Sequence, residues 1–266
     1  MRILDARRVR SADKRGSSWP VLVETDDGLR FTKLRGAAQG TGALVAEVIV
    51  AELAEALGLR VPARSLVRFG ADVESVDKND ELADLLRASA GMNLGFAYLE
   101  GAENFAPGAD VERVTADEAA AIQWLDGLTS NPDRTERNPN LMWWNDGLWL
   151  IDHGAALGFQ YSLPDVEVAA ARRPYSVRQT HLLQSRTPDL AALDADFAGR
   201  LTREVVEHAV GEVPDEFLAP LGASRFAYVE YLLNRLEAPR PFLAALVVQG
   251  TQRPGRQRPA WLDRGR

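Results

Sequence analysis

Five polar residues have the types and order needed to transfer a phosphoryl group: Lys33, Glu47, Asp133, Asn138 and Asp152. In such a site a lysine holds the phosphates of ATP, and a glutamate orients the lysine. One aspartate orients or deprotonates the acceptor hydroxyl, while an asparagine and a second aspartate hold Mg²⁺. Carboxylate and amide oxygens are hard ligands, which suit Mg²⁺ rather than Zn²⁺.

Lys33 and Glu47 lie among apolar residues. On the expected strand Lys33 shares a face with Leu29 and Phe31, because residues two apart point the same way. The neighbours of Glu47 on one helical face are all apolar: Ala43, Leu44, Val50, Ala51 and Ala54. An unpaired buried carboxylate costs about 3–5 kcal/mol, so Lys33 is the economical partner. Alternatively, the ammonium of Lys33 reaches solvent at the end of its aliphatic side chain. Glu47 would then lie at the edge of the apolar stripe formed by its helical neighbours and would reach water.

Two of the other three residues lie in a polar loop at 129–140, and the third follows the hairpin after this loop. Asp133 and Asn138 lie in this loop, where two Asn-Pro pairs restrict the backbone to extended geometry. Asp152 directly follows an apolar strand and precedes His153 and a glycine. Such a carboxylate suits a metal site. The loop could also be an ordinary connector, and we expect His153 to be a packing or structural residue rather than a catalyst.

Hydrophobic periodicity predicts the elements that must position these residues. The first third has the period of strands and the last half that of helices, which indicates an α+β fold. Asp27-Gly28 and Asn145-Asp146-Gly147 predict hairpin turns, and Thr115 with Glu118 predicts a capping box. The expected strands are 3–10, 21–24, 29–34, 64–69, 94–101, 141–144 and 148–151. The expected helices are 43–57, a short one after the loop 71–83, 116–128 and segments near 179–184, 188–210, 222–237 and 240–248.

Composition excludes several other classes. The 266-residue chain has no cysteine and three histidines, which excludes disulfides, thiolate catalysis and a His-rich metal site. Its net charge is −7, which argues against a global nucleic-acid or anionic-membrane surface. Residues 249–266 carry five Arg and one Asp, so this basic end is +4 and the remaining body −11. We find no membrane span and no signal peptide, and expect a cytoplasmic protein.

Only three of the 31 basic residues are lysines: Lys14, Lys33 and Lys78. Lys14 lies in a polar loop and Lys78 in an acidic one, whereas Lys33 lies on an apolar strand face. A lysine is a compact point charge on a flexible stem, which suits contact with phosphates. The lysine usage therefore singles out the same residue as the strand pattern.

Two blocks of the chain resemble the HipA-like kinases. The first block is Lys33, Gly40, Leu44, Glu47 and the helix exit at 57–62. The second block is Asn131-Pro-Asp-Arg134, Asn138-Pro-Asn-Leu141 and Trp149-Leu-Ile-Asp-His-Gly154. The Asp133-Arg134 pair and the spacing to Asn138 are also similar to the phosphoinositide kinases. The resemblance covers about residues 15–160 in motif terms.

This resemblance implies a bilobal protein-kinase-like fold. A small lobe at 1–100 would have an antiparallel sheet and one helix, a larger and mainly helical lobe would follow at 101–248, and 249–266 would be a flexible basic tail. No G-x-G-x-x-G motif is present, and the metal segment reads Asp-His-Gly. The chain is shorter than the toxin kinases that name the family.

The resemblance also implies the site. Lys33 and Glu47 would be the phosphate-anchoring pair, Asp133 the catalytic base, and Asn138 and Asp152 the Mg²⁺ ligands. The further residues implied to bind ATP are Gly16, Ser17 and Ser18 over the phosphates and Tyr98, Leu99 and Glu100 at the hinge. The acceptor would be a hydroxyl of a protein, or alternatively of a small molecule or lipid. A nucleotide-binding pseudokinase scaffold and a protein without a nucleotide site remain open alternatives.

Overall fold

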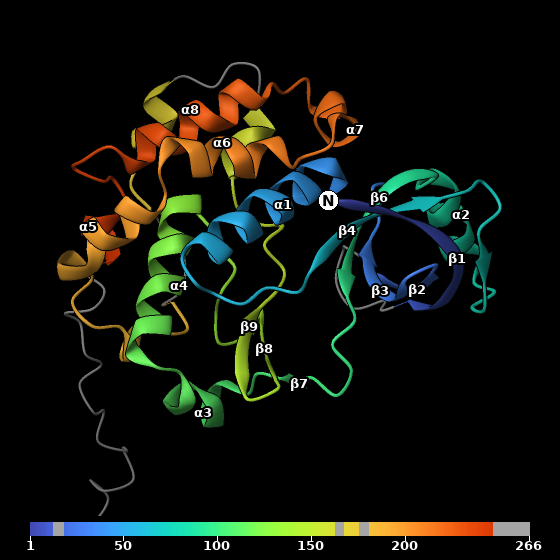
Figure 1. The fold of residues 1–266 in the computed structure, drawn as a ribbon, viewed down its shortest axis with the longest axis horizontal. Helices are drawn as coiled ribbons and strands as arrows, with labels where there is room; N and C mark the ends of the chain where they lie inside the picture. The colour runs from blue at the N-terminus through green and yellow to red at the C-terminus, as the bar shows by residue number, and fades with distance from the viewer. Residues whose placement is uncertain (13–18, 163–167, 176–180, 247–266) are drawn as a thin grey trace, which may run out of the picture.

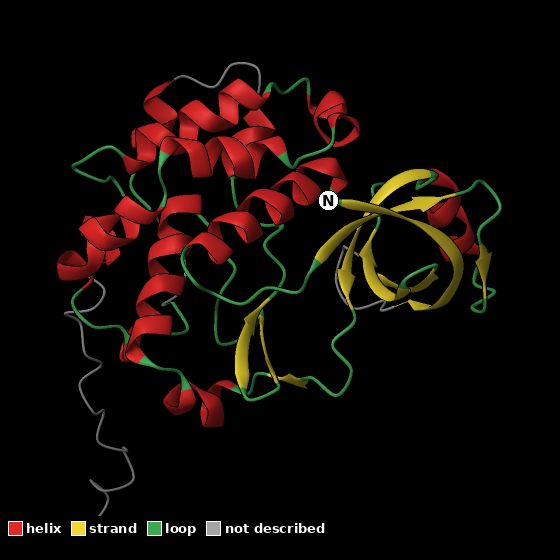
Figure 2. Ribbon diagram, viewed as in Figure 1, coloured by secondary structure: helices red, strands yellow, loops and turns green. Residues whose placement is uncertain are grey.

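The computed structural model describes residues 1–12, 19–162, 168–175 and 181–246. A strongly curved sheet lies at one end of the molecule, and most of the helices lie at the other (Figures 1 and 2). The strands are β1 Arg2–Ala12, β2 Val21–Thr25, β3 Gly28–Lys33, β4 Arg64–Phe69, β5 Glu74–Ser75, β6 Gly91–Ala97, β7 Glu103–Asn104, β8 Leu141–Trp144 and β9 Gly147–Leu150. The α-helices are α1 Gly40–Ala56, α2 Asp80–Ala88, α3 Pro107–Asp110, α4 Ala116–Thr129, α5 Leu190–Arg200, α6 Arg203–Gly211, α7 Asp215–Leu218 and α8 Arg225–Leu236. The mixed α+β class predicted from periodicity is confirmed.

The larger sheet has the order β2-β3-β6-β4-β1-β5, and an additional pairing between β1 and β2 closes it on itself. The first half of β1 pairs with β4, and its second half pairs with β2. Irregular register between Ala6 and Arg8 and between Val9 and Ser11 lets the strand bend from one partner to the other. The predicted antiparallel pairing holds for β1 with β2 and is wrong for β1 with β4 and β5, to which it runs parallel. The long stretch of chain between β1 and β4 makes the parallel pairing possible.

Strand β6 lies between β3 and β4 and brings Lys33 opposite Leu94. This strand ends at Ala97, so the predicted extension to residue 101 is wrong. The chain turns at Gly101, whose φ is +77°, and continues into the small sheet β7-β8-β9. Residues 98–100 therefore form a connection between the two sheets.

Helix α1 joins the sheet end to the helical end of the molecule. It follows β3 by one short loop, yet its apolar side chains pack chiefly against α4, α6 and α7. The apolar residues inside the large sheet form a separate cluster with Leu82 and Leu86 of α2. Gly58, with φ +84°, ends α1 in the left-handed conformation that glycine favours.

Local sequence signals set the elements around the polar loop. Thr115 and Glu118 form the predicted capping box at the start of α4. At the β8–β9 turn Asn145 and Asp146 have φ of 47° and 57°, the two positive values that a tight hairpin requires. The loop that carries Asp133 is thus held between a capped helix and a hairpin.

The C-terminal helices are shorter than predicted. The predicted helix at 188–210 is wrong as one unit, because Thr202 caps a new helix and separates α5 from α6. Ser224 caps α8 in the same manner. The segment near 179–184 and the helix at 240–248 lie partly outside the described residues. None of the helices in the described ranges has the length and apolar character to span a bilayer.

Candidate active site

Lys33, the last residue of β3, is buried with its ammonium between two carboxylates. It is 6% exposed, and its Nζ donates to Glu47 and, at 2.5 Å, to Oδ1 of Asp152. Burial alone lowers the pKa of Lys33, but the charges of Glu47 and Asp152 outweigh burial and raise the pKa to about 12. The alternative in which the lysine reaches solvent does not hold. Lys33 is a fixed positive charge at the meeting point of a strand, a helix and a hairpin.

Glu47 lies in the middle of α1 and is fully buried. Its Oε1 accepts from Lys33, while its buried Oε2 has no hydrogen-bond partner among the described residues. Burial raises the pKa of Glu47 against the opposing charge of Lys33. The alternative, in which Glu47 reaches water at the edge of the helix, does not hold either. Its charge depends on the lysine, as the apolar stripe predicts.

Asp152 follows β9 and has a positive φ of 56°. Burial acts to raise its pKa, but the charge of Lys33 prevails and lowers it. A Cβ on Gly154 would lie 3.2 Å from Cβ of Ala43 and 3.3 Å from Oε1 of Glu47. A side chain at this position would therefore crowd α1. Glycine lets the Asp-His-Gly segment approach the helix closely enough for Asp152 to reach the lysine.

His153 is buried beside this cluster. Neither of its ring nitrogens has a hydrogen-bond partner among the described residues. Burial and the charge of Arg134 lower its pKa to about 3, so the ring is neutral. A buried, neutral ring without hydrogen-bond partners among the described residues agrees with the expectation that His153 is a packing residue.

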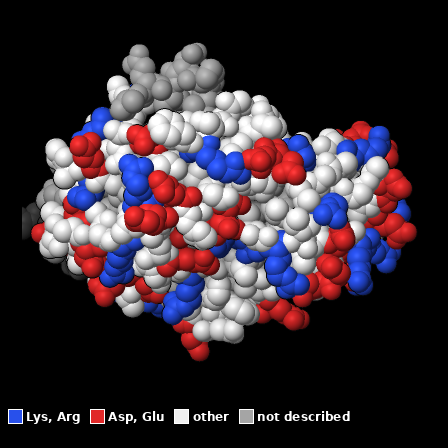
Figure 3. Space-filling model, turned by 45° about the horizontal axis from the view of Figure 1, so that its top comes forward, with Lys and Arg blue, Asp and Glu red and all other residues white. Residues whose placement is uncertain are grey.

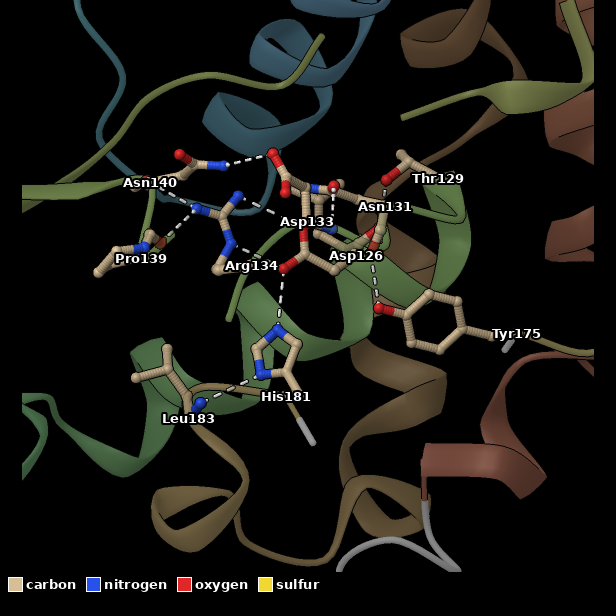
Figure 4. A network of polar contacts seen from close by, with 11 residues as sticks. Asp126, Thr129, Asn131, Asp133, Arg134, Pro139, Asn140, Tyr175, His181 and Leu183 are labelled. Carbon is tan, nitrogen blue, oxygen red and sulfur yellow. Dashed lines mark hydrogen bonds and ion pairs between the residues drawn. The ribbon is translucent and has the colours of Figure 1, made fainter. Parts of the chain in front are cut away.

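Asp133 is half-buried in the loop between α4 and β8. Its Oδ2 accepts from Nδ2 of Asn138 at 2.7 Å. The same oxygen accepts from Nδ2 of Asn140 at 3.4 Å (Figure 4). Burial raises the pKa of Asp133, and the negative charge of Asp152 adds to this effect. The loop thus holds a carboxylate of raised basicity within electrostatic reach of Asp152. Such a carboxylate can accept a proton from a hydroxyl.

A cavity of about 340 Å³ opens beside Lys33, Asp152 and His153. Of the three predicted hinge residues, Tyr98 and Leu99 line it and Glu100 does not. Phe96 and Ala97, which precede the hinge residues on the same predicted crossing segment, also line it. The other lining residues are Pro20, Phe31, Ala51, Val61, Pro62, Asn104, Met142, Leu150 and Ile151. A mostly apolar cavity with a charged end suits a flat aromatic ring whose polar substituent reaches the charges. Gly16, Ser17 and Ser18 lie outside the described residues.

Two buried polar residues beneath the loop, Asp126 and His181, were not predicted from the sequence. Asp126 and Arg134 are both buried and form an ion pair at 2.7 Å, and His181 contacts the same carboxylate (Figure 4). Asp126 lies between Leu125 and Leu128 on α4. As with Glu47, a carboxylate among apolar residues of a helix was the sequence signal that could have predicted a buried ion pair. Its histidine partner is 55 residues away and has no local signal.

Comparison with known proteins identifies the family. The model of the HipA-like kinase family matches residues 7–186, which include every predicted site residue. The chain belongs to the HipA-like kinase family. The resemblance seen in the sequence is confirmed, and with it the class of phosphotransferases. No curated protein matches this HipA-like kinase.

Solved structures similar to this HipA-like kinase include the crystal structure of the Helicobacter pylori proinflammatory kinase CtkA. The two chains are 12% identical, with a TM-score of 0.50 over 90% of this chain and 95% of that chain. At this identity the comparison shows a shared fold. The match extends over both the sheet end and the helical end of the molecule.

Proposed function

We propose that this HipA-like kinase transfers the γ-phosphoryl group of ATP to a hydroxyl group, with Ser or Thr of a protein as the acceptor and Mg²⁺ as the cofactor. One observation carries the proposal. Lys33, buried between Glu47 and Asp152, lies at the charged end of an apolar cavity, and Asp133 lies within electrostatic reach of the same aspartate. This arrangement combines an anchor for phosphates, oxygen ligands for a cation and a base for the acceptor.

The nucleotide would lie with its base in the cavity and its phosphates at Lys33. The apolar walls, which include Val61, Phe96 and Leu150, suit the faces of adenine. The ammonium of Lys33 would then contact a phosphate oxygen, while Glu47 keeps the side chain in place from the opposite side. Because Glu47 already holds the lysine, binding only has to exchange the contact with Asp152 for one with a phosphate oxygen.

Asp152, which contacts Lys33, and Asn138, which contacts Asp133, have side chains that suit a magnesium ion. Asp152 has a side chain that is 40% exposed, and Asn138 is exposed beside Asp133. Their carboxylate and amide oxygens are the donors that Mg²⁺ prefers. Asp152 and Asn138 would hold the ion, which when bound would neutralise charge on the phosphates.

Asp133 would orient the acceptor hydroxyl and take its proton during transfer. The hydroxyl oxygen attacks the γ-phosphorus, the bond from that phosphorus to the bridging oxygen breaks, and ADP leaves. The raised pKa of Asp133 strengthens it as a base, and Asn138 and Asn140 fix the direction of its carboxylate.

The surface charge favours a protein or small molecule over a lipid bilayer as the acceptor. Figure 3 shows acidic and basic side chains interspersed over the described part of the face drawn, without a broad basic area. An anionic membrane or nucleic acid attracts clustered Lys and Arg. We therefore propose a hydroxyl of a soluble acceptor, and Ser or Thr follows from the family resemblance.

Two measurements test the proposal. We expect MgATP to raise the melting temperature of the wild type, and γ-labelled ATP to label Ser or Thr in a protein extract. Asp133→Asn should retain the MgATP shift and lose the label. Asp146→Asn, an exposed turn residue with the same chemical change, is the matched control and should label as the wild type does.

Each other outcome supports a different function. Stabilisation by MgATP without transfer or hydrolysis would indicate a pseudokinase scaffold. No stabilisation at millimolar nucleotide would reject both nucleotide functions. Label that appears only in a lipid or small-molecule fraction would change the acceptor class, and equal labelling by Asp133→Asn would refute the assigned base.

A further inference from the structure

A buried carboxylate lies directly beneath the loop that carries Asp133. Asp126, in the last turn of α4, is 0% exposed. It accepts from Nδ2 of Asn131 at 2.9 Å, from Nε of Arg134 at 2.7 Å and from Nε2 of His181 at 2.9 Å (Figure 4). Burial opposes its ionisation, but the charge of Arg134 prevails and holds the pKa of Asp126 well below its usual range. The group therefore remains an acceptor.

Arg134 ties the two ends of the loop to this carboxylate. Its Nε and Nη2 donate to Asp126, and its Nη1 donates to the carbonyl oxygen of Asn140 at 2.7 Å. The side chain is 1% exposed, so its guanidinium is taken up by contacts within the protein rather than by a ligand. The span from Asn131 to Asn140 is thereby closed around one ion pair.

A short chain of hydrogen bonds connects this ion pair to Asp133. The amide of Asn131 donates to Asp126, and its Oδ1 accepts from the backbone N–H of Asp133 at 3.1 Å. The carboxylate of Asp133 itself contacts only loop asparagines among the described residues. Its position relative to Lys33 and Asp152 therefore depends on the contacts beneath the loop.

Two residues that follow the β8–β9 hairpin, Tyr175 and His181, donate hydrogen bonds to Asn131 and Asp126. Nδ1 of His181 accepts from the N–H of Leu183 at 3.2 Å, so its Nε2 carries the proton and donates to Asp126. The hydroxyl of Tyr175 donates to the carbonyl oxygen of Asn131 at 2.6 Å. Burial raises the pKa of Tyr175, which keeps it a donor. Figure 4 shows the ring of His181 directed at Asp126 and the hydroxyl of Tyr175 directed at Asn131.

We infer that Asp126, Tyr175 and His181 are positioning residues for phosphoryl transfer, which hold Asp133 at the place where it meets the acceptor hydroxyl. A displacement of about 1 Å in a reacting group can lower a rate by about 10²-fold. These residues lie outside the cavity, so they act on transfer and not on nucleotide binding. The kinetic part of this inference rests on the proposed function.

Tyr175→Phe is the mildest test, because it removes one hydroxyl. The lost hydrogen bond corresponds to about a two- to tenfold decrease in kcat, with the KM for MgATP within about twofold of wild type. Tyr228→Phe is the matched control, since Tyr228 is also buried and donates to Oε1 of Gln160 at 3.0 Å. It should lower the melting temperature and leave kcat unchanged.

His181 permits a rescue experiment. His181→Leu removes the donor to Asp126, and we expect a decrease in kcat of about 10- to 100-fold because the acceptor is charged. Gln can place an N–H near the position of Nε2, so His181→Gln should recover most of the loss. A purely structural role predicts that both variants lose stability but have the kcat of the wild type when it is measured below their melting temperatures.

Hydrogen–deuterium exchange tests the positioning without reference to transfer. Tyr175→Phe should speed exchange of the amides in residues 131–140, and Tyr228→Phe should not. Slow exchange that is unchanged in Tyr175→Phe, or an equal loss of kcat in both Tyr variants, overturns the inference. If the wild type transfers no phosphate, the proposed function fails, and the exchange data alone decide whether these residues hold the loop.

Discussion

Replacing Lys33 by methionine removes the ammonium that both buried carboxylates share. Glu47 is fully buried and would be left with an uncompensated charge close to Asp152. Removing one partner of a buried ion pair costs about 3–5 kcal/mol. Glu47 can reduce this cost by taking up a proton, so we expect the lower end, about 3 kcal/mol. In a chain of this length that lowers Tm by about 6–12 °C.

The loss should depend on pH in a specific direction. Burial already raises the pKa of Glu47, and Lys33 is the main group that opposes this. Without the lysine the folded-state pKa rises further above its unfolded value. Protonated Glu47 then stabilises the fold below its unfolded pKa, and this contribution is lost as pH rises through the folded value. Lys33→Met should therefore lose less stability at pH 5 than at pH 8.

Thermal melts with and without MgATP give the measurement. Lys33→Met should remain folded and lose the nucleotide-dependent shift, which for the wild type is about 2.7 kcal/mol when the ligand is at a hundred times its Kd. Lys78→Met is the control, because Lys78 lies in an acidic loop away from the cavity. It should keep both the stability and the MgATP shift of the wild type.

The double variant Lys33→Met/Glu47→Gln separates the ion pair from other effects of the substitution. With both charges gone, no carboxylate is left unpaired at Glu47, so the double variant should melt higher than Lys33→Met alone. A double variant that melts no higher, or a Lys33→Met variant whose loss is the same at both pH values, would refute the dependence of the Glu47 charge on Lys33.

Three further substitutions have defined outcomes. Asn140→Gly keeps the positive φ of 51° and removes a donor that lowers the pKa of Asp133, so the acid limb of the kcat–pH profile should move to higher pH. Asp152→Asn should weaken the Mg²⁺ dependence of the ATP thermal shift, measured by titrating Mg²⁺ at fixed ATP, whereas an unchanged titration would remove Asp152 from the proposed ligands. Gly95→Ala would place a Cβ 2.5 Å from Cγ2 of Val67, and should destabilise the sheet by about 1–3 kcal/mol in denaturant unfolding.

Local physical chemistry made much of this structure predictable. The capping box at Thr115 and the Asn145-Asp146 turn were confirmed because a few neighbouring residues determine each of them. The contact between Lys33 and Glu47 followed from a similar local argument, since a carboxylate on an apolar helical stripe needs a cation. The catalytic and ligand roles of these residues stay predictions.

Long-range pairing could not be predicted in the same way. Strand β1 divides its hydrogen bonds between β2 and β4, and no pattern within residues 2–12 indicates this division. Helix α1 is apolar on most of its surface, so its periodicity does not show which neighbours it packs against. His181 reaches Asp126 only because the segment after the hairpin returns beneath the loop, which depends on the tertiary fold.

The use of arginine and lysine follows the different geometry of the two cations. Arg235 is buried and donates to the carbonyl oxygens of Leu128 and Gly127 at 2.6 and 2.7 Å, and Arg134 closes the loop beneath Asp133 in a similar way. A planar guanidinium can hold several fixed acceptors at once, and it would break those contacts if it moved. Lys33 instead presents one nitrogen to two carboxylates. In the proposed reaction that nitrogen can turn from Asp152 to a phosphate oxygen while Glu47 keeps it in place, which a guanidinium bound to backbone carbonyls cannot do.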